Sequence, residues 1–209
     1  MAEAAVSPPD PAATLRSKRF LALLVLASLV GVVVSIVAWA FLELLHYIQE
    51  WVFTDIPRDV GYDSTPLWWY PPVLAVAGLV AAFAIVRLPG RGGHVPAGGL
   101  NTGPTQPIEV PGVILAALAS IGLGLVVGPE APLIAIGGGL GIFAARQLQK
   151  AAPEEVGALL AAAGAFSALG FLFGSPIIAA VILIEATGLG GPRLPLVLVP
   201  GLLASGMGR

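Results

Sequence analysis

The chain has 209 residues, of which 57% are hydrophobic and 11% are charged, and its mean hydropathy is +0.93. Soluble domains carry about 25% charged residues, so this composition indicates a membrane protein whose natural partner is the lipid bilayer. The net charge of −2 argues against a nucleic-acid partner, and the absence of cysteine excludes disulfides and thiolate metal sites. His46 and His94 have no partners at ligand spacing, so we expect no metal and no cofactor.

Two long uncharged runs predict the first membrane-spanning helices. Residues 1–15 are polar and rich in proline and alanine, and we expect them to form a disordered cytoplasmic N-terminus. The run 20–42 is long enough to cross about 30 Å of hydrocarbon, and residues 43–53 predict its interfacial extension. The run 67–86 opens with a Trp-Trp-Tyr sequence that suits the headgroup region, and it returns the chain to the first side.

The next apolar stretches are shorter and surround one carboxylate. Segment 92–107 is rich in glycine, proline and threonine, which predicts a short helix or an irregular segment. The uncharged stretches 111–129 and 131–145 flank Glu130. The first stretch is marginal for a span and the second is too short for one.

The last part of the chain predicts an interrupted helix and one further helix. The run 156–184 is uncharged but contains Phe-Gly-Ser-Pro at 173–176, and glycine and proline stop helices, so we expect two helices with a bend. Segment 194–207 predicts the final helix. The predicted fold class is therefore all-α, a polytopic membrane protein with tilted and discontinuous helices.

The distribution of basic residues fixes the expected orientation. Cytoplasmic loops of membrane proteins carry an excess of lysine and arginine. Five acids and one arginine lie between residues 43 and 66, which indicates an external loop. We therefore expect a multi-pass protein of the cell membrane with a cytoplasmic N-terminus. The bases that fall on the cytoplasmic side in this topology are Arg16, Lys18, Arg19, Arg87, Arg91, Arg146, Lys150 and Arg193.

Glu130 is the main candidate for a functional residue. A charged group in the membrane costs several kcal/mol unless it is neutral, paired or facing water, and such groups mark ion pathways. Pro132 suits the first turn of a helix that begins near Glu130. A helix N-terminus offers free N–H groups to an anion, so a carboxylate held there can compete with the anion and act as a gate. The alternative is that Glu130 only caps its helix or lies at the interface.

Other motifs have weaker functional interpretations. The segment 92–96, Gly-Gly-His-Val-Pro, can open a second short helix that faces the first, or it can be a loop at the membrane edge. His94 is better explained as a polar residue at the membrane interface than as a ligand. Glu185 fits helix capping better than proton transfer. The glycines at 137–139 and 141 predict close helix packing.

With these motifs in hand, the sequence resembles the CLC family of chloride channels and chloride/proton antiporters. The segment 128–132, Gly-Pro-Glu-Ala-Pro, and the glycines that follow it resemble the motif that carries the family's gating glutamate. Residues 161–185 resemble the next helix pair, and residues 91–96 lie where the family has its Gly-Ser-Gly-Ile-Pro loop. The resemblance implies that residues 16–209 form a CLC-like transmembrane half-domain with the fold of the first inverted repeat.

The resemblance also implies site residues and shows departures from the family. Glu130 matches the gating residue, whereas Ala186 replaces the internal proton-accepting glutamate of antiporters. This departure favours passive chloride conduction, gated by voltage or by the glutamate, over proton-coupled exchange. Gly93 replaces the serine that binds the central anion, and Pro129 replaces the basic residue of the gating motif. The anion-binding residues implied by position are Gly93, His94, Val95, Gly128 and Ala131.

The chain supplies one of the two halves from which the family builds its anion site. We therefore expect a homodimer or a complementary second half as partner, and chloride or another small anion as the transported species. The alternative is a non-conducting half-domain or assembly partner that requires a second chain. An intramembrane serine protease using Ser175 and His94 lacks a nucleophile signature, so we expect no enzyme activity.

Overall fold

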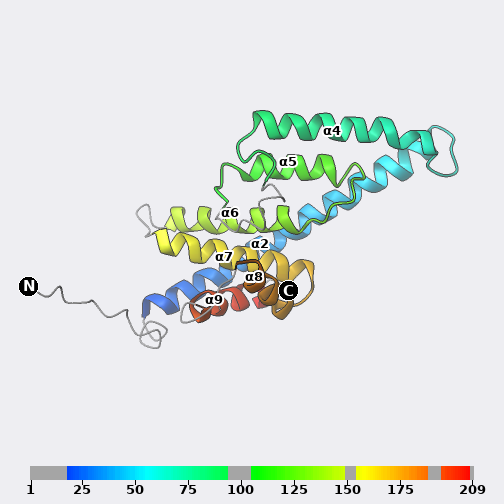
Figure 1. Ribbon diagram of the computed structural model, residues 1–209. Coiled ribbons are helices and arrows are strands. Elements are labelled where there is room, and N and C mark those ends of the chain that lie inside the picture. The colour runs from blue at the N-terminus through cyan, green and yellow to red at the C-terminus, as the bar shows by residue number, and fades with distance from the viewer. Residues whose placement is uncertain (1–17, 94–104, 149–153, 188–193, 208–209) are drawn as a thin grey trace, which may run out of the picture.

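The computed structural model describes residues 18–93, 105–148, 154–187 and 194–207, and the described residues contain helices and no strand (Figure 1). The all-α fold class predicted from the sequence is therefore confirmed. The expected N-terminal segment 1–15 lies outside the described residues.

The N-terminal helix is the longest element. Helix α2 (Lys18–Glu50) continues through a π-helical turn, η1 (Trp51–Asp55), into α3 (Ile56–Asp59). The predicted span and its interfacial extension are therefore one apolar helical rod, Phe20–Asp59, of 40 residues. π-helical turns are rare and often lie near functional sites, which directs attention to what this turn contacts.

The next long helix, α4, is joined to the π-helical turn by side-chain contacts. A short 3₁₀ turn, η2 (Leu67–Trp69), leads into α4 (Tyr70–Arg87). The Trp69 Nε1–H group donates to the Val52 carbonyl oxygen at 3.0 Å. The rings of Phe53 and Tyr70 stack with centroids 5.5 Å apart. These contacts hold the C-terminal end of α2 and the π-helical turn after it against the start of α4.

Helix α5 (Val110–Ser120) is shorter than the apolar stretch that predicted it. Gly124 adopts φ +95°, and the N–H of Leu125 donates to the Ser120 carbonyl at 3.0 Å while that of Gly124 donates to Ile121 at 3.1 Å. This pattern is a Schellman helix ending, in which glycine takes the left-handed conformation. Residues 125–129 therefore continue without helix, although they are as apolar as the helix before them.

Helix α6 (Glu130–Leu148) packs closely on α7 (Glu154–Leu172). Glycines at the crossing allow the two backbones to meet: a methyl group on Gly141 would overlap the carbonyl oxygen of Leu160. The close packing predicted from the glycines of α6 is confirmed.

The predicted break after α7 is also confirmed. The N–H of Ser175 donates to the Gly170 carbonyl at 3.1 Å, and Gly174 takes φ +61°, so α7 ends with the same motif as α5. Helix α8 (Pro176–Thr187) then begins with proline, whose missing N–H is tolerated in a first turn. Helix α9 (Leu194–Met207) closes the described chain.

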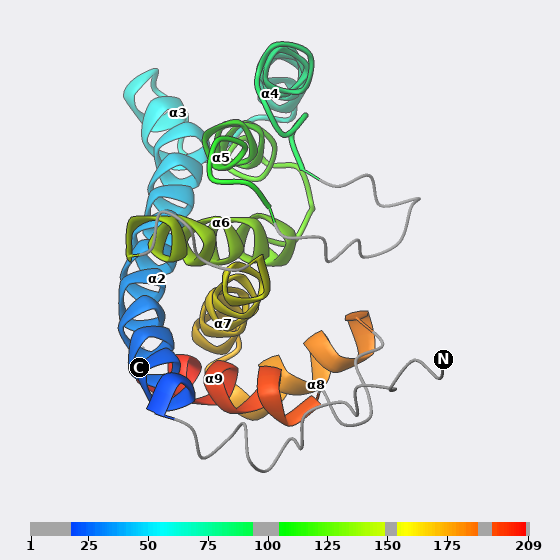
Figure 2. The same cartoon turned by 90° about the vertical axis from the view of Figure 1, so that its left-hand side faces the viewer.

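The helices form a stack with α2 along one side. Figures 1 and 2 show α4, α5, α6 and α7 lying one above the other, followed by α8 and α9, while α2 crosses beside them. Buried apolar side chains of α2, α5, α6 and α7 make the largest core cluster. In the parts of the chain that the structure describes, three helical segments are long and apolar enough to cross a membrane, namely Phe20–Asp59, Leu67–Arg87 and Glu154–Leu172.

A buried polar contact ties three of these helices together. Ser167 on α7 donates to the Gly31 carbonyl of α2 at 2.8 Å, and its hydroxyl lies 3.0 Å from that of Ser35. The α9 backbone comes so close that a methyl group on Gly31 would overlap the Ala204 carbonyl oxygen. Gly31 lets the backbones of α2 and α9 approach closely. The hydrogen bonds of Ser167 satisfy its buried hydroxyl where the three helices meet.

Candidate functional site: the start of helix α6

Glu130 is the first residue of α6, where the sequence predicted a helix to begin. The helix starts there because the Leu133 N–H donates to the Pro129 carbonyl at 3.0 Å and Pro132 occupies the first turn without needing an acceptor. In the described part of the chain, the N–H groups of Glu130 and Ala131 have no hydrogen-bond acceptor. Two donors are therefore free at the positive end of the helix dipole.

The carboxyl group of Glu130 folds back over Gly128. A methyl group placed on Gly128 would overlap the Glu130 carboxylate and come within 2.6 Å of its Cδ atom. The side chain can take this position only because residue 128 is glycine. Free N–H groups and a movable carboxylate thus lie at one helix end, an arrangement in which a dissolved anion can compete with the carboxylate.

The segment that leads to Glu130 is apolar, non-helical and largely exposed. Val126 is 103% exposed and Val127 is 60% exposed. The only backbone bond that the described structure places within residues 125–127 is from the Val127 N–H to the Leu125 carbonyl, at 2.9 Å. Irregular backbone at membrane depth is tolerated only where protein or a water-filled cavity surrounds it. An exposed, apolar and non-helical segment of a membrane protein therefore needs another protein surface or a water-filled cavity beside it.

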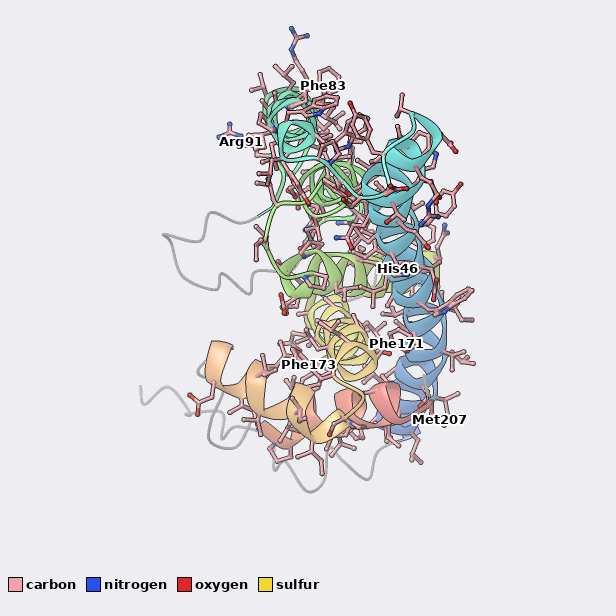
Figure 3. All side chains as sticks on the ribbon, turned by 90° about the vertical axis from the view of Figure 1, so that its right-hand side faces the viewer. His46, Phe83, Arg91, Phe171, Phe173 and Met207 are labelled. Atoms are coloured by element: carbon pink, nitrogen blue, oxygen red, sulfur yellow. The ribbon has the colours of Figure 1, made fainter. Side chains whose placement is uncertain are left out.

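Of the predicted anion-binding residues Gly93, His94 and Val95, the structure describes only Gly93. Gly93 takes φ +106°, and its N–H donates to the Gly90 carbonyl at 2.8 Å, so this donor is already used. Its α-carbon faces Val113 of α5, and the neighbouring Arg91 projects away from the helices (Figure 3). His94 and Val95 lie outside the described residues. The described contacts therefore place Gly93 against α5 and do not bring it to Glu130.

Two other charged groups singled out by the sequence or by hydrogen bonds lie at the ends of α8 and α6. Glu185 is exposed within the last turn of α8. Arg146, in the last turn of α6, donates to Gln106 Oε1, and the Gln106 N–H donates to Glu109 Oε2 at 2.8 Å. These hydrogen bonds join the last turn of α6 to the residues just before α5. Among the described residues no group of three or more histidine, aspartate or glutamate side chains could hold a metal ion.

Several helix ends that carry basic residues lie on one side of the molecule, and the acidic start of α7 lies there as well. Figure 1 shows the start of α2 and the ends of α4 and α6 on one side of the molecule, where Lys18, Arg87 and Arg146 belong. The α2–α4 connection lies at the opposite side and carries Asp55, Asp59 and Asp63. Apart from Arg58 in α3, the grouping of these bases follows the pattern of membrane proteins, in which basic residues gather on one side.

The fold and the site define a class: a polytopic helical membrane protein with interrupted helices, one of which starts at a carboxylate. The sequence matches the family model described as voltage gated chloride channel over residues 9–208, so the chain belongs to this family. The resemblance to the CLC family is therefore confirmed.

A solved structure shows the same fold. The crystal structure of a slow cyanobacterial Cl⁻/H⁺ antiporter superposes with a TM-score of 0.69 at 22% sequence identity, over 89% of this chain and 45% of the antiporter chain. The helices of this chain therefore have the arrangement found in part of a full-length CLC fold.

Curated relatives include the YfeO proteins of Salmonella paratyphi A and Salmonella typhimurium, whose name proposes a role in ion transport. Each is 31% identical to this chain over 170 residues, which cover 80% of this chain and 40% of the relative. The chain thus spans less than half the length of the relatives that it matches.

Proposed function

We propose that the chain forms one half of an anion-transport pathway in the cell membrane and that Glu130 gates it. The observation that carries the proposal is the start of α6, where the N–H groups of Glu130 and Ala131 are free and the Glu130 carboxylate lies against Gly128. A small anion such as chloride is the species that such a helix end attracts. The chain is proposed as a transport protein and not as an enzyme.

In this mechanism the carboxylate and the dissolved anion compete for the same helix end. The negative Glu130 side chain stays near the free N–H groups and keeps the anion out. Protonation removes the charge, weakens the attraction to the helix end and lets the side chain rotate away from Gly128. Anion flux is therefore expected to rise as the pH falls.

Passive conduction is proposed over proton-coupled exchange. Ala186 stands where antiporters of the family carry an internal proton-accepting glutamate, and alanine cannot bind a proton. The cyanobacterial structure named above is that of an antiporter, but its likeness at 22% identity supports the fold alone.

A complementary CLC-type half is proposed as the partner, with the N-terminus of this chain in the cytoplasm. Two observations support it: the chain matches 45% of the solved antiporter chain, and residues 125–129 are exposed, apolar and not helical. A homodimer would supply the inverted half only if two copies inserted in opposite orientations, and the one-sided distribution of bases opposes that.

Chloride efflux between pH 5 and pH 7, from proteoliposomes that hold the chain together with a complementary CLC-type half, tests the gate. Glu130→Gln places a neutral amide at the same position, so flux at pH 7 is expected to reach the level that the wild type shows at acid pH. Glu154→Gln is the matched control, because Glu154 is the exposed first residue of α7. An unchanged pH profile in Glu130→Gln would remove the gating role.

A second candidate is a non-conducting assembly partner, favoured by the fact that the chain spans 40% of its curated relatives. Co-expression with a complementary half separates the two functions. Flux that requires both chains and loses its pH dependence in Glu130→Gln supports a conducting half. Flux that is indifferent to Glu130 supports the assembly partner.

A further inference from the structure

The outer part of the N-terminal rod holds the turn that ends α5. Gln49 of α2 donates its Nε2–H to the Ile121 carbonyl oxygen at 2.9 Å, across 72 residues of sequence. The ring of Phe53, in the π-helical turn, fills the space beside Gly124, where a methyl group would come within 2.7 Å of its Cζ atom. The position of this turn is therefore set by α2 and not by α5 alone.

Gln49 supplies the polar part of this contact. The Ile121 carbonyl is one of the last carbonyls of α5, which have no partner inside the helix. It accepts from the Gly124 N–H at 3.1 Å and from Gln49 at 2.9 Å. An amide side chain that is half-buried in an apolar bundle is costly unless it is hydrogen-bonded, so this bond opposes separation of α2 from the turn.

The held turn is connected to Glu130 by a short link. Only residues 125–129 separate it from the start of α6, and this link ends in Gly128 and Pro129. Because the Glu130 carboxylate lies against Gly128, a shift of the link changes the surface on which the carboxylate rests.

We propose that Gln49 is a positioning residue for Glu130: it anchors the end of α5 and thereby the segment 125–129 on which the carboxylate lies. The pH dependence assigned to Gln49 below rests on the proposed gating function, whereas the anchoring itself does not. Loss of the anchor lets the link move and weakens the hold of the helix end on the charged carboxylate. The carboxylate then leaves the helix end more readily.

The first experiment is a double-mutant cycle on chloride efflux. Gln49→Met keeps the length of the side chain and removes its donor, and it is expected to move the pH of half-maximal flux upward by about 0.5 to 1 unit. Gln49→Lys keeps an N–H donor and is expected to restore most of the wild-type profile. Gln147→Met, at an exposed position of α6, is the matched control. In a Glu130→Gln background the shift is expected to vanish, because coupled residues are not additive.

The second experiment measures the anchor without flux. The chain has no cysteine, so two cysteines can be introduced and spin-labelled at Val126 and Leu29, both exposed. Leu29 lies about 30 Å along α2 from Gln49 at 1.5 Å per residue, and Gln49 contacts Ile121, just before Val126, so the two labels are far enough apart for a dipolar distance measurement. Gln49→Met is expected to widen the distance distribution about twofold, whereas Gln147→Met leaves it unchanged.

The outcomes separate the two proposals. If Gln49→Met widens the distance distribution while Glu130→Gln leaves the pH profile of chloride flux unchanged, the anchoring role of Gln49 is supported and the gating role of Glu130 is rejected. An unchanged distribution in Gln49→Met overturns the anchor, whatever Glu130 does. A pH shift of the same size in the presence and absence of the Glu130 carboxylate also overturns it, because Gln49 would then act elsewhere.

Discussion

Gly137 and Gly164 face each other where α6 crosses α7, and a methyl group on either one would overlap the carbonyl oxygen of the other. Backbones can approach this closely only where side chains are absent, which is how helices associate in membranes without a hydrophobic driving force. The crossing lies two turns after Glu130 on the same helix. The start of α6 is therefore held by backbone packing against a buried helix.

Gly164→Ala is expected to lower the free energy of unfolding by about 1–3 kcal/mol, because the added methyl meets rigid backbone and forces the helices apart. Thermal or denaturant unfolding in detergent measures the change. Gly157→Ala is the control on the same helix, since its methyl meets nothing within 4 Å. That control should be neutral or more stable by up to about 1 kcal/mol. Equal losses in both variants would contradict close packing at the crossing.

Helix beginnings and endings were predictable where local chemistry determines them. Glu130 and Pro132 predicted the start of α6, and the Phe-Gly-Ser-Pro sequence at 173–176 predicted the break after α7. The end of α5 at Ser120 was not predicted, because the uncharged run continues to Pro129 and hydropathy does not distinguish helical from non-helical chain. The available signal was Gly124, which can adopt the left-handed conformation of a helix ending.

The site was predictable in its chemistry and not in its contacts. The sequence alone indicated that a carboxylate and free N–H groups share one helix start. It did not indicate that Gly128 makes room for the carboxylate, or that Gln49 reaches Ile121, since that bond joins residues 72 positions apart. The roles of Gly93, His94, Val95, Gly128 and Ala131 in anion binding stay predictions.

Gly128→Ala is expected to displace the Glu130 carboxylate without unfolding the protein. The added methyl meets only the end of a flexible, exposed side chain, which can rotate to another staggered position. The free energy of unfolding should change by less than about 1 kcal/mol, while chloride efflux should lose part of its pH dependence, as in Glu130→Gln. Gly78→Ala, which meets nothing within 4 Å on α4, is the control for both measurements. A wild-type pH profile in Gly128→Ala would show that the carboxylate position does not matter for flux.

Ser167→Ala is expected to destabilise the junction of α2, α7 and α9. The substitution removes the donor to the Gly31 carbonyl and the partner of the Ser35 hydroxyl, all in a buried site. Hydrogen bonds between membrane helices contribute about 0.6 to 2 kcal/mol, so a loss in this range is expected in detergent unfolding. Ser28→Ala serves as the control, because Ser28 donates only to Leu24 on its own helix. A loss no larger than that of the control would mean that water replaces the bond.

A chloride gradient is expected not to drive protons across the membrane through this chain, alone or with its complementary half. Proton exchange requires an internal group that accepts the proton from the cytoplasmic side, and the position that corresponds to it holds Ala186. The exposed Glu185 beside it belongs to the last turn of α8, and no hydrogen bond or ion pair joins its side chain to another described residue. Proteoliposomes loaded with a pH-sensitive dye should show chloride flux without acidification or alkalinisation until a protonophore is added. Glu185→Gln should leave that result and the chloride flux unchanged. A proton signal that runs against its own gradient, is driven by chloride and is lost in Glu185→Gln would instead identify Glu185 as the internal acceptor and the protein as an exchanger.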